Sequence, residues 1–170
     1  MDSDSPIKDF LGEFGWYQRR GIAPNLTKKD LTKLWEDSAI VRLNPNEFDK
    51  YGNFSPYKNN LNGKIEDRIK KLMQIATTEN REDVFDTKWQ RKRKANPTEY
   101  FRNLAELVYS GKGYPPVTVV DVNGIRRFIT GGRTRAAIGK ALNVPVNTKI
   151  IKIKHIGPWS DRAKKIMKIK

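Results

Sequence analysis

The segment from 115 to 153 constrains the fold more than any other part of the sequence. Residues 117–122 are rich in β-branched side chains, as in a buried strand, and Asn123-Gly124 follows them directly. Asn-Gly between two apolar runs is a strong hairpin signal, because both residues tolerate a positive φ. The pattern therefore predicts a second strand over 125–130.

The predicted hairpin leads into a glycine-rich turn. Gly131-Gly132 precedes a helical pattern that runs from Arg133 to about Leu142, and Asn143 is placed to end the helix. A further strand is expected over 148–153. This order of strands and helix predicts an α+β fold with a small mixed sheet and packed helices.

The rest of the chain adds helices and one short strand to this unit. Thr27 is placed to cap a helix that ends at about Asp37, and a short strand is expected over 39–43. Further helices are predicted over 64–77 and 97–110, and a long polar loop over 44–63. The predicted organisation has three parts. An N-terminal arm with a short helix covers 1–37, a core covers 38–158 and contains an insertion at about 47–96, and a basic helical tail covers 159–170.

Residues 1–27 lack a clear helical or strand pattern, and we expect an irregular arm. It carries a cluster of apolar side chains before the basic pair Arg19-Arg20, and the cluster comprises Phe10, Leu11, Phe14, Trp16 and Tyr17. Two interpretations stay open. The arm either docks its aromatic side chains on the core, or uses them to stack on bases or to bind a partner.

Charge limits the classes of partner. The chain has 34 Lys and Arg against 19 Asp and Glu, a net charge of +15, and such a field attracts polyanions, nucleic acid first among them. A membrane surface fits less well, because the lysine-rich tail lacks a wide apolar face. No apolar run approaches about 18 residues, and the start is acidic, so we expect a soluble, cytoplasmic protein.

The residue types exclude several chemistries. There is no cysteine, which excludes disulfides, thiolate catalysis and cysteine-based zinc sites. The sole histidine, His155, cannot build a multi-histidine metal site, and we interpret it as incidental to catalysis. An oxygen-ligated Mg²⁺ remains open.

Two basic segments are candidate contacts for nucleic acid. The run from 88 to 94 places a tryptophan among five cations, a combination that suits unstacked bases, although a solvated charge run is the alternative. The tail adds further lysines. The candidate residues are Lys88, Trp89, Arg91, Lys92, Arg93, Lys94, Lys164 and Lys165.

The junction between the predicted strand and helix is a candidate phosphate site. The first N–H groups of a helix are unpaired and lie at its positive end, and glycine lets a phosphate approach the backbone. The site comprises Gly131, Gly132, Arg133, Thr134 and Arg135. Arginine binds phosphate oxygens through two parallel hydrogen bonds. The alternative is a tight turn whose arginines pair with surface acids.

At these residues the sequence resembles the ParB N-terminal domain/sulfiredoxin-like superfamily. The resemblance covers about 97–154 and, more loosely, 38–46. The motifs that carry it are Pro115-Pro116-Val117-Thr118-Val119-Val120, then Ile129-Thr130-Gly131-Gly132-Arg133-Thr134-Arg135, then Val144-Pro145-Val146. The resemblance implies a compact core that binds a nucleoside triphosphate, CTP or ATP, together with Mg²⁺. The binding site would be the start of the helix, where Gly132 to Arg135 match the family's Gly-x-x-Arg motif. The resemblance also favours DNA over RNA as the nucleic acid.

Departures from the family narrow the function. Arg133 stands where sulfiredoxin has its catalytic cysteine, and sulfiredoxin chemistry is therefore excluded. The residues after the core are too few for the DNA-binding helix-turn-helix domain of the partition proteins. Three functions stay open: a ParB-like nucleotide-binding protein that acts on DNA, with nuclease or other phosphotransfer or hydrolase activity as an option; a non-catalytic DNA- or RNA-binding module; and a basic protein that binds an acidic protein partner. Carboxylates that could hold a metal are Glu47, Glu66, Asp67, Glu99 and Asp121.

Overall fold

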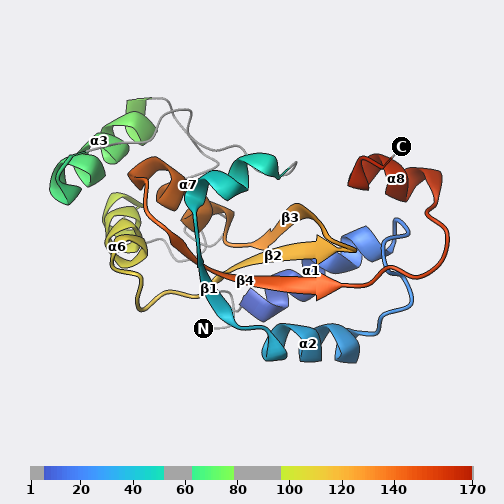
Figure 1. Ribbon diagram of the computed structural model, residues 1–170. Helices are drawn as coiled ribbons and strands as arrows, with labels where there is room; N and C mark the ends of the chain where they lie inside the picture. The colour runs from blue at the N-terminus through green and yellow to red at the C-terminus, as the bar shows by residue number, and fades with distance from the viewer. Residues whose placement is uncertain (1–5, 52–62, 79–96, 170) are drawn as a thin grey trace.

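The computed structural model describes residues 6–51, 63–78 and 97–169. These residues form an α+β fold, in which a four-stranded mixed sheet has helices on both faces (Figure 1). The sheet order is β1-β4-β2-β3. The strands are β1 (Ile40–Leu43), β2 (Val117–Val122), β3 (Ile125–Gly131) and β4 (Val146–Ile153). The predicted fold class is therefore confirmed.

The hairpin of β2 and β3 forms where the sequence predicts it. Asn123 and Gly124 have φ values of 52° and 86°, the positive values that a type I′ turn requires. The Asp121 carboxylate accepts a hydrogen bond of 2.8 Å from the Gly124 N–H and supports the turn. The two strands pair antiparallel with irregularities after Thr118 and Val120.

A crossover through α7 (Arg133–Leu142) places β4 beside β2. These two strands are parallel, and β1 then pairs antiparallel with the other edge of β4. Asn143 ends α7 in the left-handed conformation with φ 59°, as predicted. The start of α7 consequently lies beyond the end of β3, at an edge of the sheet.

One face of the sheet is covered by what we call the α7 layer. It comprises α7, α6 (Pro97–Ser110), α3 (Ile65–Thr78) and the 3₁₀ helix η2 (Pro45–Lys50). Alternate residues of β2 point into this core, including Val117 and Val119. From α6, Leu104 and Val108 are buried in this core, whereas Leu107 is 38% exposed.

The predicted loop over 44–63 is structured at its start. Asn44 caps η2 by accepting a hydrogen bond of 2.9 Å from the Asn46 N–H. From α7, the buried Lys140 donates to Asn46 and Asp49, at 2.5 and 2.8 Å. These bonds fix η2 on α7, and the prediction of a continuous loop was wrong there. The remainder of the predicted loop lies largely outside the described residues.

The opposite face is covered by the α1 layer. It comprises α1 (Pro6–Gln18), α2 (Lys28–Asp37) and α8 (Asp161–Met167), which pack on Val120, Phe128 and Ile151 among others. The prediction of an irregular arm was wrong, because Phe10, Phe14 and Tyr17 recur at helical spacing and are all buried on the sheet. The interpretation that these aromatics dock on the core is confirmed.

The other two helices of this layer agree with the sequence. Thr27 caps α2, and its hydroxyl and the Asp30 carboxylate form the reciprocal bonds of a capping box. The tail is helical as predicted, and it is anchored to the core by Ala163 and Met167.

His155 holds the chain just before α8. It is buried, its Nδ1 accepts a hydrogen bond of 3.0 Å from the Ala23 N–H, and its ring stacks on Trp159 at 3.7 Å. These contacts give His155 a structural role.

Candidate functional site

The start of α7 has the backbone geometry expected of an anion site. β3 ends at Gly131, and Gly132 occupies the N-cap position in the left-handed conformation with φ 88°. Since glycine has no side chain, the first turn of α7 receives no side-chain cap from this position. Its N–H groups face the end of the helix where the dipole places partial positive charge.

The Arg135 side chain lies across this helix start. A Cβ atom at Gly132 would lie 2.7 Å from Nη2 of Arg135 and 3.0 Å from its Nε. The absence of a side chain at Gly132 therefore makes room for the guanidinium group. The structure thus brings Gly131, Gly132 and Arg135 together; it describes Thr134 only as a backbone position in α7.

Arg133 turns toward α1 and pairs with Glu13. Its Nη2 lies 2.6 Å from Oε2 of Glu13, and its Nη1 lies 3.4 Å from Oε1. Burial raises the pKa of Glu13 above its ordinary value, an effect that Arg133 opposes and the negative charge of Asp9 reinforces. The alternative in which an arginine of the turn pairs with an acid is therefore confirmed for Arg133.

Sequence reasoning missed the two acids of α1 that flank this turn. Asp9 lies against Gly131: a Cβ atom added to Gly131 would lie 3.3 Å from the Cβ of Asp9. Glu13 follows Asp9 by one helical turn. The spacing of four residues places both acids on one side of a helix. The four-residue spacing is visible in the sequence, but it indicates a shared side only if the segment is helical, and this segment was predicted to be irregular.

A surface pocket of about 490 Å³ adjoins the Arg133–Glu13 pair. Most of its lining comes from α1 and the residue that follows that helix, and Arg133 closes one side. The lining residues are Gly12, Glu13, Trp16, Tyr17, Arg19 and Arg133. The pocket thus combines an aromatic surface with cationic side chains, and it connects the start of α7 with the outer side of α1.

Trp16 and Arg20 form a stacked pair beside this pocket. The Arg20 guanidinium carbon lies 3.4 Å from the centroid of the indole ring, and Nη1 donates a hydrogen bond of 2.8 Å to the Trp16 carbonyl. The Tyr17 ring meets the indole edge-on, with centroids 5.0 Å apart. Trp16 nevertheless remains 43% exposed.

Three arginines gather where the end of α1 meets the start of α8. Partial desolvation and the positive charges of Arg162 and Arg19 lower the pKa of Arg20. The close approach depends on Gly21, where an added Cβ would lie 2.7 Å from Oγ of Ser160. Within the described part of the chain, none of these three arginines forms an ion pair.

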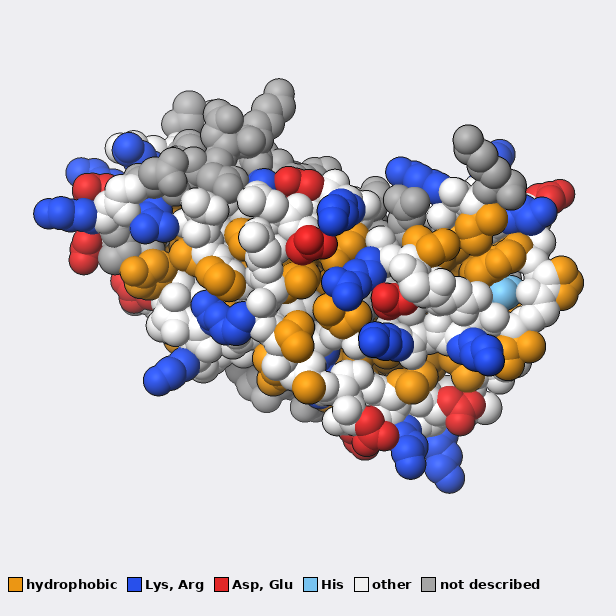
Figure 2. Space-filling view, in the orientation of Figure 1, with side chains coloured by type: hydrophobic (Ala, Val, Ile, Leu, Met, Phe, Trp, Pro, Cys, Tyr) orange, Lys and Arg blue, Asp and Glu red, His pale blue; other side chains and the backbone are white. Residues whose placement is uncertain are grey.

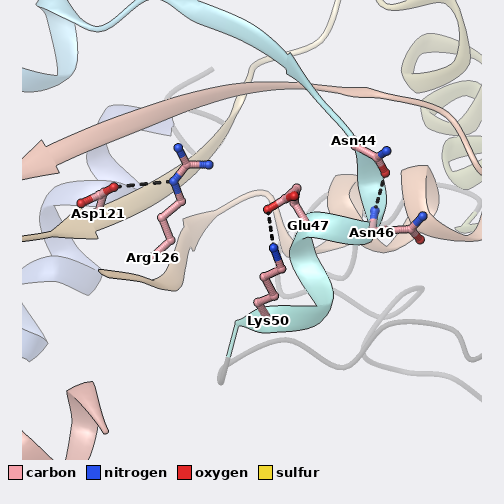
Figure 3. A network of polar contacts seen from close by, with 6 residues as sticks. All are labelled: Asn44, Asn46, Glu47, Lys50, Asp121 and Arg126. Atoms are coloured by element: carbon pink, nitrogen blue, oxygen red, sulfur yellow. Dashed lines mark hydrogen bonds and ion pairs between the residues drawn. The ribbon is translucent and has the colours of Figure 1, made fainter. Parts of the chain in front are cut away.

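The described carboxylates named from the sequence do not gather into a group of three that could hold an ion. Glu47 pairs with Lys50 at 3.2 Å, and Asp121 lies 3.6 Å from Arg126, so each has its own cation (Figure 3). Glu66 and Asp67 are exposed in the first turn of α3. The Glu99 side chain lies outside the described side chains.

No metal centre forms among the residues that the structure describes. They contain no group of three or more histidine, aspartate or glutamate side chains that could hold an ion. Asp9 and Glu13 are two carboxylates at most, and Glu13 is already paired with Arg133. We therefore derive no step through a metal.

The remaining candidate residues lie apart from the pocket or outside the described chain. Lys164 and Lys165 lie on α8, the helix that carries Arg162. The run that contains Lys88, Trp89, Arg91, Lys92, Arg93 and Lys94 lies outside the described residues. On the face shown in Figure 2, lysine and arginine side chains are spread among acidic ones rather than gathered in one patch.

No known family model, curated protein or solved structure matches this chain. The resemblance to the ParB N-terminal domain/sulfiredoxin-like superfamily therefore stays a hypothesis that rests on the quoted motifs. In the regions that the structure describes, every helix is too short or too polar to cross a membrane. Arguments about function consequently start from the chemistry of the α1 and α7 surface.

Proposed function

We propose that the protein binds nucleic acid on the surface where α1, α8 and the start of α7 meet. The observation that carries the proposal is the packing of Gly21 on Ser160 and Ala163, which brings Arg19 and Arg20 beside Arg162 from distant parts of the chain. Like charges held together destabilise one another, and a polyanion relieves their repulsion. The net charge of +15 favours the same class of ligand.

The start of α7 extends this surface along the backbone of the ligand. Arg135 lies over Gly132 at the positive end of the helix, a position where a phosphate would meet both a guanidinium group and backbone N–H groups. Arg133 lies between this point and the pocket. It would exchange its partner Glu13 for a phosphate when the ligand binds.

The salt dependence of binding tests this proposal. The five arginine contacts predict that log K for duplex DNA falls against log salt with a slope of about −4 to −5. The measurement is fluorescence anisotropy of labelled DNA and RNA of equal length between about 50 and 200 mM NaCl. DNA is expected to bind more tightly than RNA, as the family resemblance implies.

Variants place the contact on the molecule. Arg133→Ala is expected to reduce the slope by about 1, whereas Arg102→Ala, an exposed cation of α6, should leave it unchanged. Absence of binding at about 50 mM salt would overturn the proposal, as would a slope that Arg133→Ala and Arg102→Ala reduce equally.

The backbone geometry at Gly132 supports a second candidate function, the binding of a nucleoside triphosphate such as CTP or ATP. The space that a Cβ would fill at Gly132 holds the Arg135 guanidinium, and the neighbouring pocket of about 490 Å³ is of the size that small ligands occupy. Gly132, Arg133 and Arg135 would hold the phosphates. A bound triphosphate would bring phosphoanhydride bonds to the site. This second candidate function covers only binding of the nucleotide and includes no cleavage of those bonds.

Thermal stability separates the two candidates. A nucleotide that binds only the folded protein raises the melting temperature by mass action. CTP or ATP with Mg²⁺ is expected to raise the melting temperature of the wild type and to leave that of Arg135→Ala unchanged. If neither nucleotide shifts the wild type, the second candidate is rejected and nucleic-acid binding is unaffected.

A further inference from the structure

We infer that the pocket beside Trp16 binds an unpaired base, so that this protein takes nucleic acid in single-stranded form. The inference rests on the proposed function, because it specifies which form of nucleic acid the surface binds. It is carried by the environment of Trp16 and by the arginines around the pocket. Both features lie mainly on α1, and the start of α7 contributes only Arg133, on one side of the pocket.

The exposure of Trp16 is not a consequence of core packing. The apolar face of α1 is complete without it, because Phe10, Phe14 and Tyr17 are buried against the sheet. Trp16 instead lines the pocket and keeps 43% of its surface exposed. A large aromatic side chain in this position has the geometry of a stacking platform.

Arg20 completes the platform. Its hydrogen bond to the Trp16 carbonyl holds the guanidinium over the indole, with the guanidinium carbon 3.4 Å from the ring centroid. A base that enters the pocket meets a planar aromatic and a planar cation, and each stacks on the π-face that every base possesses. Recognition of this kind tolerates any base sequence.

The pocket also has room for a base. Gly12 lies in its lining, and a Cβ atom added there would meet nothing within 4 Å. The missing side chain leaves open the space beside Trp16 along the outer side of α1. The volume of about 490 Å³ lies within the range of pockets that hold ligands larger than one base.

The cations around the pocket match a strand with its base turned inward. Arg19 and Arg133 line the pocket, and Arg20 stacks on Trp16 at its side, so phosphates on either side of the bound base would each have an arginine in reach. A duplex keeps its bases paired and stacked inside, and extracting one costs a few kcal/mol. The arrangement therefore favours a single strand.

The experiment compares two DNA probes and three variants. The probes are fluorescein-labelled oligo-dT of about 12 nucleotides and a duplex of the same length, titrated by anisotropy with the full chain. Trp16→Ala should weaken binding of the single strand about 10-fold and of the duplex less than 2-fold, and Trp16→Phe should restore most of the loss. Tyr109→Ala removes an exposed aromatic of α6 and should change neither affinity.

The outcomes separate this inference from the proposed function. If the wild type binds both probes with salt dependence but Trp16→Ala changes neither affinity, or both equally, the base-binding inference is overturned and the proposed function stands. If the wild type binds neither probe, both are overturned. Melting curves of the variants verify folding, and Trp16→Leu, which keeps an apolar side chain without an aromatic ring, provides the test should Trp16→Ala fail to fold.

Discussion

The α7 layer and the α1 layer cover opposite faces of one sheet, and they use their cations differently. In the α7 layer, Lys140 donates to two side chains of η2, and Arg68 donates to the carbonyls of Gly63 and Leu142. In the α1 layer, Arg19, Arg20 and Arg162 gather without an ion pair among the described residues. The difference teaches that the first layer uses its cations to hold the fold, whereas the second keeps a cluster of cations at the surface, which the proposed function assigns to ligand binding.

Removing a large core side chain from either layer should give the largest effect on stability, but only one of the two changes should affect binding. Phe14→Ala, in the buried aromatic row of α1, is expected to cost about 3–5 kcal/mol of unfolding free energy, and Leu72→Ala in α3 about 2–5 kcal/mol. Urea denaturation measures both. At temperatures where both variants are folded, Phe14→Ala should also weaken nucleic-acid binding, and equal affinities would contradict the difference between the layers.

A glycine inside a helix of each layer provides the next comparison. At Gly139 of α7 an added Cβ would overlap the Val146 side chain of β4, so Gly139→Ala is expected to cost about 1–3 kcal/mol. At Gly12 of α1 nothing lies within 4 Å, so Gly12→Ala should stabilise by up to about 1 kcal/mol through helix propensity. Denaturation midpoints of the two variants should shift in opposite directions. A shift in the same direction would show that one of the two helices packs differently.

Loss of the α2 cap should change stability and leave binding intact. Thr27→Ala removes the hydroxyl that accepts the Asp30 N–H at 3.1 Å and should cost about 1 kcal/mol. Thr27→Ser, which keeps the hydroxyl, is the matched control. Thermal denaturation gives the stability change. A change of affinity in Thr27→Ala would mean that the binding surface extends onto α2.

The smallest effect is expected at Glu13, and it carries a pH signature. Burial raises the folded-state pKa of Glu13 above the ordinary value of 4.5, so the folded state binds the proton more tightly than the unfolded state does. Its contribution to stability is consequently largest at low pH and declines as pH rises from 4.5 through the folded pKa. Glu13→Gln should remove that decline, which urea denaturation at several pH values would detect.

The same variant should increase affinity for nucleic acid. Glu13→Gln removes a negative charge from the pocket and releases Arg133 from its ion pair, so binding should tighten about 3-fold at low salt. Glu36→Gln, an exposed acid of α2, is the charge-matched control. Weaker binding in Glu13→Gln would indicate that the carboxylate itself contacts the ligand.

Local signals predicted most of the fold. The Asn123-Gly124 turn, the Thr27 cap and the Asn143 helix end each depend on residues close in the sequence, and the structure forms each of them. α1 was missed, because Gly12 and Gly15 lower helix propensity and obscure the helical spacing of its aromatics.

The candidate site was predicted only in part. The glycine-rich start of α7 is a local pattern and was identified with its arginines. The pocket was not, because the Arg133–Glu13 pair and the approach of Arg162 to Arg20 join segments that are distant in the sequence. Their proximity results from packing on the sheet, and no local pattern encodes it.

The central claim is that the α1 layer, rather than the net charge as a whole, binds the nucleic acid. Its most direct test is the salt dependence of single-stranded DNA binding in two variants that each lose three cations. One is Arg19→Ala/Arg20→Ala/Arg162→Ala in the α1 layer, and the other is Lys70→Ala/Lys71→Ala/Arg102→Ala, three exposed cations of the α7 layer. The account predicts that the first reduces the slope of log K against log salt by about 2 to 3 and the second by less than about 1. Equal reductions, or a larger one in the second, would contradict it.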